Sequence, residues 1–348
     1  MKTHHNVLII WITLILSISI PTQSIKADLN TLPDFELPIP SLPSPGIRDT
    51  VLTLRSVEKS NNLYTLTYHG GYRNVLERMN QDVLDHGTTL QYSCTMFSAL
   101  GNPDGPLMAR NFDSPASAVL LGHYNPPDGY SSVAFSRMND LGFNDRPDFK
   151  ELPLSKRIQL LNAPFYAIDG MNSQGVAIAI AQVRPQNVKI NPNKKTIFIT
   201  MLVREILDHA ANIDDAIELV YQYNIIDRTS NIISNHLLIT DASGRSVIIE
   251  YNAGQWNIEP NRKPWQVISN IPTVDVSLNE RMSMCWRFKT AQVQLAHFHG
   301  NFRWNQALET LMSISMKNTQ WSSIYDLKNR IVFVSLHAQP EVLTFKVE

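Results

Sequence analysis

Cysteine is scarce in this sequence of 348 residues, which contains only Cys94 and Cys285. Small secreted domains often rely on a dense disulfide framework, whereas two cysteines can form one bridge at most. A disulfide scaffold is therefore excluded, and the 43% hydrophobic residues are enough for an ordinary globular core. An unpaired thiol is reactive unless it is buried, so each cysteine has to be considered for a chemical role.

The sequence also lacks an excess of charge of either sign. Its 30 Lys and Arg residues and 31 Asp and Glu residues give a formal net charge of -1 at pH 7. Such a chain has no long-range field to attract nucleic acid or an anionic membrane surface. We therefore expect no nucleic-acid partner.

Long apolar runs are absent except for residues 7–20, near the N-terminus. A membrane span needs about 20 apolar residues, so this shorter run predicts a signal peptide over residues 1–27, cleaved after Ser24 or Ala27. An uncleaved N-terminal anchor is the alternative. We expect an exported protein (secreted, periplasmic or luminal) with no integral membrane span.

Motifs for nucleotides and metals are missing as well. The sequence has no glycine-rich phosphate loop, no His-Glu-x-x-His and no Cys-x-x-Cys. His297 and His299 are two residues apart, and on a helix such a pair points to different faces, so helix-end capping is the simpler interpretation. There is no Gly-x-Ser-x-Gly turn to present a serine nucleophile. We expect no metal and no cofactor.

What the chain does contain is a series of distinct segments. Residues 32–45 are rich in proline and predict an extended strap, followed by a strand at 63–68 and a helix at 72–84. Residues 28–93 are thus interpreted as a strap and a small folded prosegment ahead of a catalytic domain, 94–348.

The catalytic domain combines hairpins with pairs of helices, which indicates an α+β layered fold. Strands are predicted at 94–100, 107–112, 176–183, 236–240, 246–251, 265–269, 331–336 and 342–347, and helices at 196–211, 215–223 (capped by Asp214), 278–298 and 305–316.

The first predicted hairpin of this domain brings Arg110 and Asp113 back beside Cys94. A guanidinium next to a thiol favours the thiolate and lowers its pKa from about 8.5. The aspartate can orient the attacking group. From the spacing alone, Cys94 could equally be a buried structural cysteine beside an Arg-Asp pair.

Five segments occur in the order found in the choloylglycine hydrolase and penicillin V acylase family, and the chain resembles this family over 94 to about 290. They are 94–95 with 110–113, then 169–176, 238–250, 267–272 and 283–288. The resemblance implies a four-layer αββα N-terminal-nucleophile (Ntn) hydrolase sandwich that acts on linear, non-peptide amide bonds.

The resemblance also implies the roles of individual residues. The chain would cut itself between Ser93 and Cys94, and the new α-amine of Cys94 would act as general base for its own thiol. Substrate attack would lead through an acyl-thioester. The candidate site residues are Cys94 as nucleophile, Arg110 and Asp113 beside it, Asn270 and Gln182 as oxyanion donors, and Arg287 holding the network.

A long prosegment departs from the bile-salt and penicillin branches of the family and resembles the acid ceramidase-like and acyltransferase-like relatives. The expected substrate is a small N-acyl amide whose acyl part contacts Phe135, Met138, Phe143 and Phe165. An acyltransferase and a non-catalytic exported binding protein are the alternatives, and a homo-oligomer is left open. Cys285 is expected to be a buried small side chain that does not bridge to Cys94.

Overall fold

The computed structural model describes residues 46–60, 62–86, 92–144, 147–336 and 341–348. The predicted signal peptide and the proline-rich strap up to residue 45 lie outside these residues. Within them, no helix is both long enough and apolar enough to cross a membrane.

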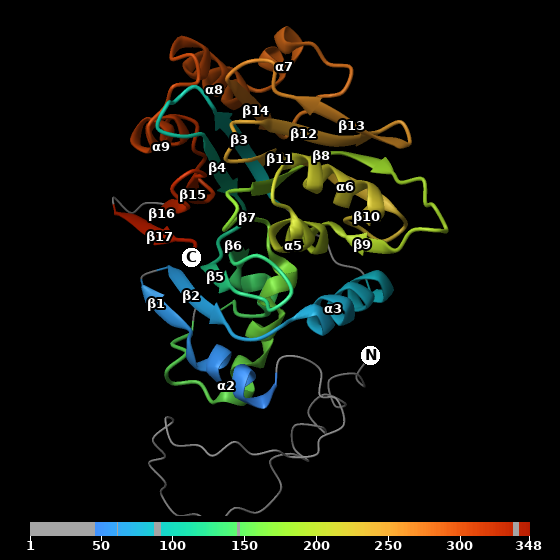
Figure 1. Cartoon of the computed structure of the whole chain (residues 1–348), viewed down its shortest axis with the longest axis vertical. Coiled ribbons are helices and arrows are strands. Elements are labelled where there is room, and N and C mark those ends of the chain that lie inside the picture. The colour runs from blue at the N-terminus through green and yellow to red at the C-terminus, as the bar shows by residue number, and fades with distance from the viewer. Residues whose placement is uncertain (1–45, 61, 87–91, 145–146, 337–340) are drawn as a thin grey trace, which may run out of the picture. The chain divides into compact units, whose positions relative to one another are not determined.

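The larger of two β-sheets has nine strands among the described residues, in the order β1-β2-β5-β6-β7-β8-β11-β12-β13 (Figure 1). All neighbouring strands are antiparallel except β2 and β5, which run parallel. The strands are β1 (Glu58–Ser60), β2 (Leu63–Tyr68), β5 (Val119–Tyr124), β6 (Ser132–Arg137), β7 (Asp169–Asn172), β8 (Ala177–Asn187), β11 (Ile232–Thr240), β12 (Ser246–Asn252) and β13 (Gln255–Pro260).

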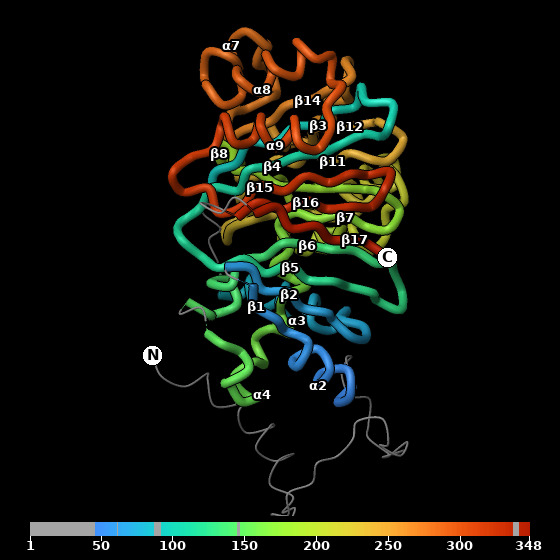
Figure 2. Tube along the Cα trace, turned by 90° about the vertical axis from the view of Figure 1, so that its left-hand side faces the viewer, coloured from blue at the N-terminus to red at the C-terminus, as the bar shows by residue number. Residues whose placement is uncertain are grey.

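The second sheet is antiparallel throughout, and Figure 2 shows its strands one below the other. It has six strands among the described residues, in the order β14-β3-β4-β15-β16-β17. They are β3 (Ser93–Ala99), β4 (Leu107–Asp113), β14 (Trp265–Ser269), β15 (Thr319–Asp326), β16 (Ile331–Leu336) and β17 (Val342–Lys346).

The two sheets pack face to face and carry helices on their outer faces. Strand β3 contacts β8 and β11 of the other sheet. Helices α5 (Ile199–His209) and α6 (Ile213–Gln222) cover the nine-stranded sheet, whereas α8 (Trp286–His297) and α9 (Trp304–Ser313) cover the six-stranded sheet (Figure 1). This confirms the predicted α+β fold with the four-layer αββα arrangement.

The described part of the predicted prosegment folds into α2 (Ile47–Arg55), β1, β2 and α3 (Arg73–His86). Strand β2 lies between β1 and β5, and its Tyr64 and Leu66 side chains are fully buried. Apolar side chains of α3 are buried at the spacing that the sequence indicated. The segment therefore contributes strands to the same sheet as the residues after Cys94.

Several predicted helix boundaries are wrong, among them the end of the helix predicted at 305–316, which is α9 and ends at Ser313, and three have identifiable local reasons. Residues 278–298 form two helices, α7 (Leu278–Met284) and α8, because the backbone of Cys285 is extended, with φ -142° and ψ 115°. Helix α5 starts late because β9 (Thr196–Phe198) first pairs with β10 (Asn224–Ile226). Helix α6 starts early, because Asn212 rather than Asp214 is its cap and accepts from two backbone N–H groups.

Short 3-10 and α-helical turns complete the described chain between β6 and β7. They are η2 (Met138–Leu141), α4 (Leu154–Arg157) and η3 (Ile158–Tyr166).

Candidate active site

Cys94 is the second residue of β3 and is fully buried. Its Sγ atom lies 2.9 Å from Nη2 of Arg110, and its backbone N–H donates to Oδ1 of Asn270 at 2.8 Å. Both side chains were predicted site residues. The structure thus brings the predicted nucleophile together with a guanidinium on one side and an amide oxygen on the other.

Arg110, on β4, is held rigidly by the nine-stranded sheet, although it belongs to the six-stranded one. Its Nη1 donates to the carbonyl oxygen of Ile168 and its Nη2 to that of Ile180, each at 3.0 Å. Nη1 also lies 3.1 Å from Oδ1 of Asp169. Both side chains of this ion pair are completely buried, so the guanidinium has a fixed position against the thiol.

Asp169 was not among the predicted site residues, although it begins a segment that carried the family resemblance. Its Oδ2 accepts from the hydroxyl of Tyr325 at 2.6 Å and from that of Ser323 at 3.1 Å. Burial raises the pKa of Asp169 above its usual range, although Arg110 and the hydroxyl groups act to lower it.

The thiol of the uncut chain is less acidic than the sequence suggested. Burial raises the pKa of Cys94 to about 11, and this outweighs the opposite effect of Arg110. Arg110 thus lowers the pKa of the thiol as predicted, but the larger effect of burial makes the net shift upward. Conversely, Cys94 and Asp169 keep the pKa of Arg110 above its ordinary value even though its burial acts to lower it.

Asp113, Arg287 and Asn270 form a chain of contacts that ends at Cys94. Arg287, on α8, donates from Nη1 to Oδ2 of Asp113 at 2.6 Å and from Nη2 to Oδ1 of Asn270 at 3.0 Å. Thr319 donates to the other oxygen of Asp113 at 2.6 Å. Asp113 therefore positions Arg287, and through Arg287 and Asn270 it is connected to the backbone of the nucleophile.

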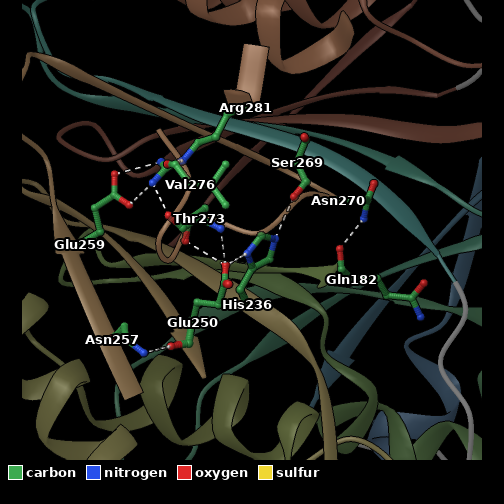
Figure 3. Close-up of polar contacts among 10 residues, drawn as sticks. All are labelled: Gln182, His236, Glu250, Asn257, Glu259, Ser269, Asn270, Thr273, Val276 and Arg281. Carbon is green, nitrogen blue, oxygen red and sulfur yellow. Dashed lines mark hydrogen bonds and ion pairs between the residues drawn. The ribbon is translucent and has the colours of Figure 1, made fainter. Parts of the chain in front are cut away.

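Gln182 is close to this cluster, but its side chain is directed elsewhere. Its Oε1 accepts from the backbone N–H of Tyr92 at 3.3 Å, whereas its carbonyl oxygen accepts from Nδ2 of Asn270 at 2.9 Å. Figure 3 shows the Gln182 side chain pointing away from Asn270. In this structure Nδ2 of Asn270 is thus engaged, and a role as oxyanion donor requires it to exchange this bond.

Other residues considered from the sequence lie outside the cluster. Both cysteines belong to the described residues and both are free, and Cys285 is only partly buried between α7 and α8. No group of three or more His, Cys, Asp or Glu side chains is placed to hold a metal ion in the described ranges. The residues predicted for the acyl group are core side chains of the uncut chain, namely Phe135, Met138, Phe143 and Phe165.

Comparison with known proteins supports the resemblance. Residues 157–300 match the model of the linear amide C-N hydrolases, choloylglycine hydrolase family. This range contains Gln182, Asn270 and Arg287, and Cys94 precedes it. A penicillin V acylase of Pectobacterium atrosepticum is 30% identical over 119 residues. That match spans 32% of this chain and 31% of the relative, so the chain matches less than a third of the relative's length.

Two solved structures share the fold. Penicillin V acylase from Agrobacterium tumefaciens superimposes with a TM-score of 0.52 at 20% identity, covering 73% of this chain and 86% of that one. A mutant of conjugated bile acid hydrolase from Clostridium perfringens gives a TM-score of 0.52 at 15% identity, covering 73% of this chain and 92% of that one. With the sequence motifs, these matches show that residues 157–300 resemble the choloylglycine hydrolase family of linear amide C-N hydrolases, and that the chain shares the fold of the two solved structures.

Proposed function

We propose that this protein is a cysteine Ntn-hydrolase that cuts itself between Ser93 and Cys94 and then hydrolyses a linear amide bond of a small N-acyl substrate. The observation that carries this proposal is the placement of Cys94: its sulfur contacts Arg110 and its nitrogen contacts Asn270, at the start of a strand. A structural cysteine has no need of a buried guanidinium at 2.9 Å from its sulfur.

The first step is an acyl shift within the chain. The sulfur of Cys94 forms a bond to the carbonyl carbon of Ser93, the C–N bond between the two residues breaks, and the thiol proton goes to the departing nitrogen. Water then hydrolyses the thioester, which leaves a carboxylate on Ser93 and a free thiol and amine on Cys94.

The second step uses the amine that the cut has created. An α-amine has a reference pKa of about 7.7 to 8.0, so near neutral pH it can take the thiol proton. The thiolate attacks the substrate carbonyl, the amine product leaves with the proton, and water resolves the acyl-thioester. Asn270, with Gln182 after its side chain has moved, would donate to the oxyanion.

The cut would also raise the fraction of Cys94 that is present as thiolate, above the small fraction available for the self-cleavage step. In the uncut chain burial raises the pKa of Cys94 to about 11, so the thiol is protonated at neutral pH. A terminal ammonium next to the sulfur adds a positive charge to that of Arg110 and favours the thiolate. Processing thus acts as activation of a precursor.

The proposed substrate class, small N-acyl amides, rests on the resemblance to the family and on the names of the similar proteins. Penicillin V and a conjugated bile acid are the first probes, because similar proteins are named for acting on these compounds. A series of N-acyl amides with acyl chains of increasing length tests the apolar acyl preference. Formation of a new amide when an amine acceptor is added would instead indicate an acyltransferase.

We also propose that the protein is exported, because residues 7–20 have the length and the flanks of a signal-peptide core. Intact mass of protein collected outside the cytoplasm tests this separately from the enzymatic proposal.

The decisive experiment is the N-terminal sequence and intact mass of purified protein, with Cys94→Ala and the matched control Cys285→Ala. We expect wild type and Cys285→Ala to contain a chain of residues 94–348. Cys94→Ala should remain uncut and inactive, with turnover reduced by at least ~10³-fold. Active protein in which Ser93 is still joined to residue 94 would overturn the proposal.

A further inference from the structure

A buried histidine–glutamate pair lies next to the turn that carries Asn270. His236 on β11 is fully buried and Glu250 on β12 is 4% exposed. Nδ1 of His236 is 3.0 Å from Oε2 of Glu250, and Nε2 is 2.9 Å from the carbonyl oxygen of Ser269 (Figure 3). The residue that follows Ser269 is Asn270.

Each member of this pair makes further hydrogen bonds to the segment around Asn270. A carbonyl oxygen can only accept, so Nε2 of His236 carries a proton. Oε2 of Glu250 accepts from the backbone N–H of Thr273 at 2.9 Å and from its hydroxyl at 2.8 Å. Although burial acts to raise it, the pKa of Glu250 is lowered by its bonds from His236 and Thr273. Oε2 of Glu250 is therefore shared between Thr273 and Nδ1 of His236.

The pair holds the Asn270 segment on both sides. The N–H of Ile271 donates to the carbonyl oxygen of Ser269 at 2.8 Å, which makes Asn270 the central residue of a three-residue turn. The oxygen that closes this turn is the one that His236 binds. Three residues after Asn270, Thr273 is bound by Glu250.

A second layer supports the same segment from outside. Arg281, on α7, donates to the carbonyl oxygen of Thr273 and, at 3.0 Å, to that of Val276. It also pairs with Glu259 of β13 at 2.8 Å. Figure 3 shows these contacts continuing from the His236–Glu250 pair to Arg281. The turn is thus fixed from the sheet below and from the helix above.

We infer that His236 and Glu250 are positioning residues of the proposed active site, which hold the Asn270 turn so that its side chain meets the nitrogen of Cys94. The inference rests on the proposed function, because Asn270 matters only if Cys94 reacts. It does not place either residue in contact with substrate. A displacement of about 1 Å at a reacting group can slow a reaction on the order of 10²-fold, so a loosened turn should affect rate.

A purely structural role for the pair makes a different prediction. If His236 only stabilises the fold, its loss should slow the cut by the same factor whether or not Asn270 is present. If it acts through Asn270, its loss should matter little once the Asn270 side chain has been removed. The effects of the two substitutions are therefore expected to be non-additive.

The experiment follows the conversion of full-length chain into chain 94–348 after cell-free synthesis. We expect His236→Phe to slow the cut by about 10- to 100-fold when it is made in the wild-type chain. When it is made in the Asn270→Ala variant, it should slow the cut by less than about 3-fold. His236→Gln keeps a donor for the Ser269 carbonyl and should recover part of the rate. The control Asp140→Asn breaks the partly buried ion pair between Arg137 at the end of β6 and Asp140 on η2, and should leave the rate unchanged.

Each outcome decides a separate point. A folded His236→Phe variant that is cut at the wild-type rate, or slowed equally in both backgrounds, overturns the inference and leaves the proposed function standing. A wild-type chain that is never cut overturns the proposed function itself. If His236→Phe does not fold, Glu250→Gln takes its place with the same expected factors and the same two decisions.

Discussion

Two fully buried arginines, Arg110 and Arg204, show how similar surroundings can have different uses. Each is near an aspartate, Asp169 at 3.1 Å and Asp208 at 2.8 Å. Each guanidinium also lies over an aromatic ring, 4.8 Å from the centroid of Phe112 for Arg110 and of Tyr124 for Arg204. Burial, charge and pairing therefore do not distinguish them.

The difference lies in what else each guanidinium reaches. Arg110 contacts the thiol of Cys94. Arg204, on α5, donates to the hydroxyl of Ser132 at 2.5 Å, and its partner Asp208 accepts from the hydroxyl of Tyr72 at 2.7 Å. Tyr72 precedes Cys94 in the chain. We call Tyr72, Tyr124, Ser132, Arg204 and Asp208 the anchor cluster, because it joins the prosegment to the rest of the protein.

The largest expected effect that separates the two clusters is on the rate of the cut. Arg110→Lys should slow it by at least ~100-fold, because one ammonium cannot reach two carbonyl oxygens and the thiol together. Arg204→Lys should keep the rate within about 2-fold and lower the free energy of unfolding by about 1–3 kcal/mol through lost hydrogen bonds. Time courses after cell-free synthesis and urea denaturation measure these quantities. If both substitutions slowed the cut to a similar extent, Arg110 would have no role in the cut that Arg204 lacks.

A smaller effect concerns the prosegment after the cut. We expect it to remain bound to chain 94–348 through β2 and the anchor cluster, so that both pieces elute together in size-exclusion chromatography and separate in denaturant. Tyr72→Phe removes one buried hydrogen bond, worth about 1.4 kcal/mol, and should speed release of the prosegment about 10-fold. The control Tyr251→Phe loses a bond to Lys189 within the later part of the chain and should not change release. Release of the wild-type prosegment without denaturant would contradict the anchoring role.

The smallest expected effect concerns how the free energy of unfolding depends on pH. Glu250 and Asp208 should change it in opposite directions as pH rises. The pKa of Glu250, near the Asn270 turn, is lowered by hydrogen bonds from His236 and Thr273 despite its burial, whereas burial raises that of Asp208 in spite of Arg204. The stability that Glu250 contributes is therefore present above its usual pKa of 4.5 and is lost as pH falls through its lower folded value. For Asp208 the contribution is present below 3.8 and is lost as pH rises through the raised folded value.

This difference can be read from unfolding free energies of wild type, Glu250→Gln and Asp208→Asn between pH 3 and pH 7. Each unit of pKa shift corresponds to about 1.4 kcal/mol. The difference in unfolding free energy between wild type and Glu250→Gln should become smaller toward low pH. The corresponding difference between wild type and Asp208→Asn should become smaller toward high pH. Parallel curves for the two variants would show that both carboxyl groups are shifted in the same direction.

Local sequence patterns predicted the part of the candidate site that lies on neighbouring segments of the chain. Cys94, Arg110 and Asp113 lie on two strands joined by a short turn, so their proximity follows from one hairpin. Asn270 and Arg287 were found through motifs. The alternation in residues 63–68 and the helical spacing in α3 were also sufficient to place β2 and α3.

The features that the sequence did not predict depend on distant partners. The Gln182 side chain points to the backbone of Tyr92, and Tyr72 meets Asp208 only because β2 enters the sheet beside β5. Strand β5 was missed because its nearly continuous burial gives no alternation of polar and apolar residues. The resemblance indicated the four layers, but it could not indicate which buried aspartate would meet which arginine.

The position of Cys94 within its sheet has a consequence for a chain cut between Ser93 and Cys94, as we propose. Chain ends ordinarily fray, because they lack neighbours on one or more sides. Here Ser93 and Cys94 pair with Asp113 and Phe112 of β4, and the next residue, Thr95, pairs with Ser269 of β14. A terminus made at this point starts inside a sheet with a strand on either side. Cys94 itself would pair with β4 and the chain would be paired on both sides from Thr95 onward, so less conformational entropy would have to be lost to align its amine than at a free chain end.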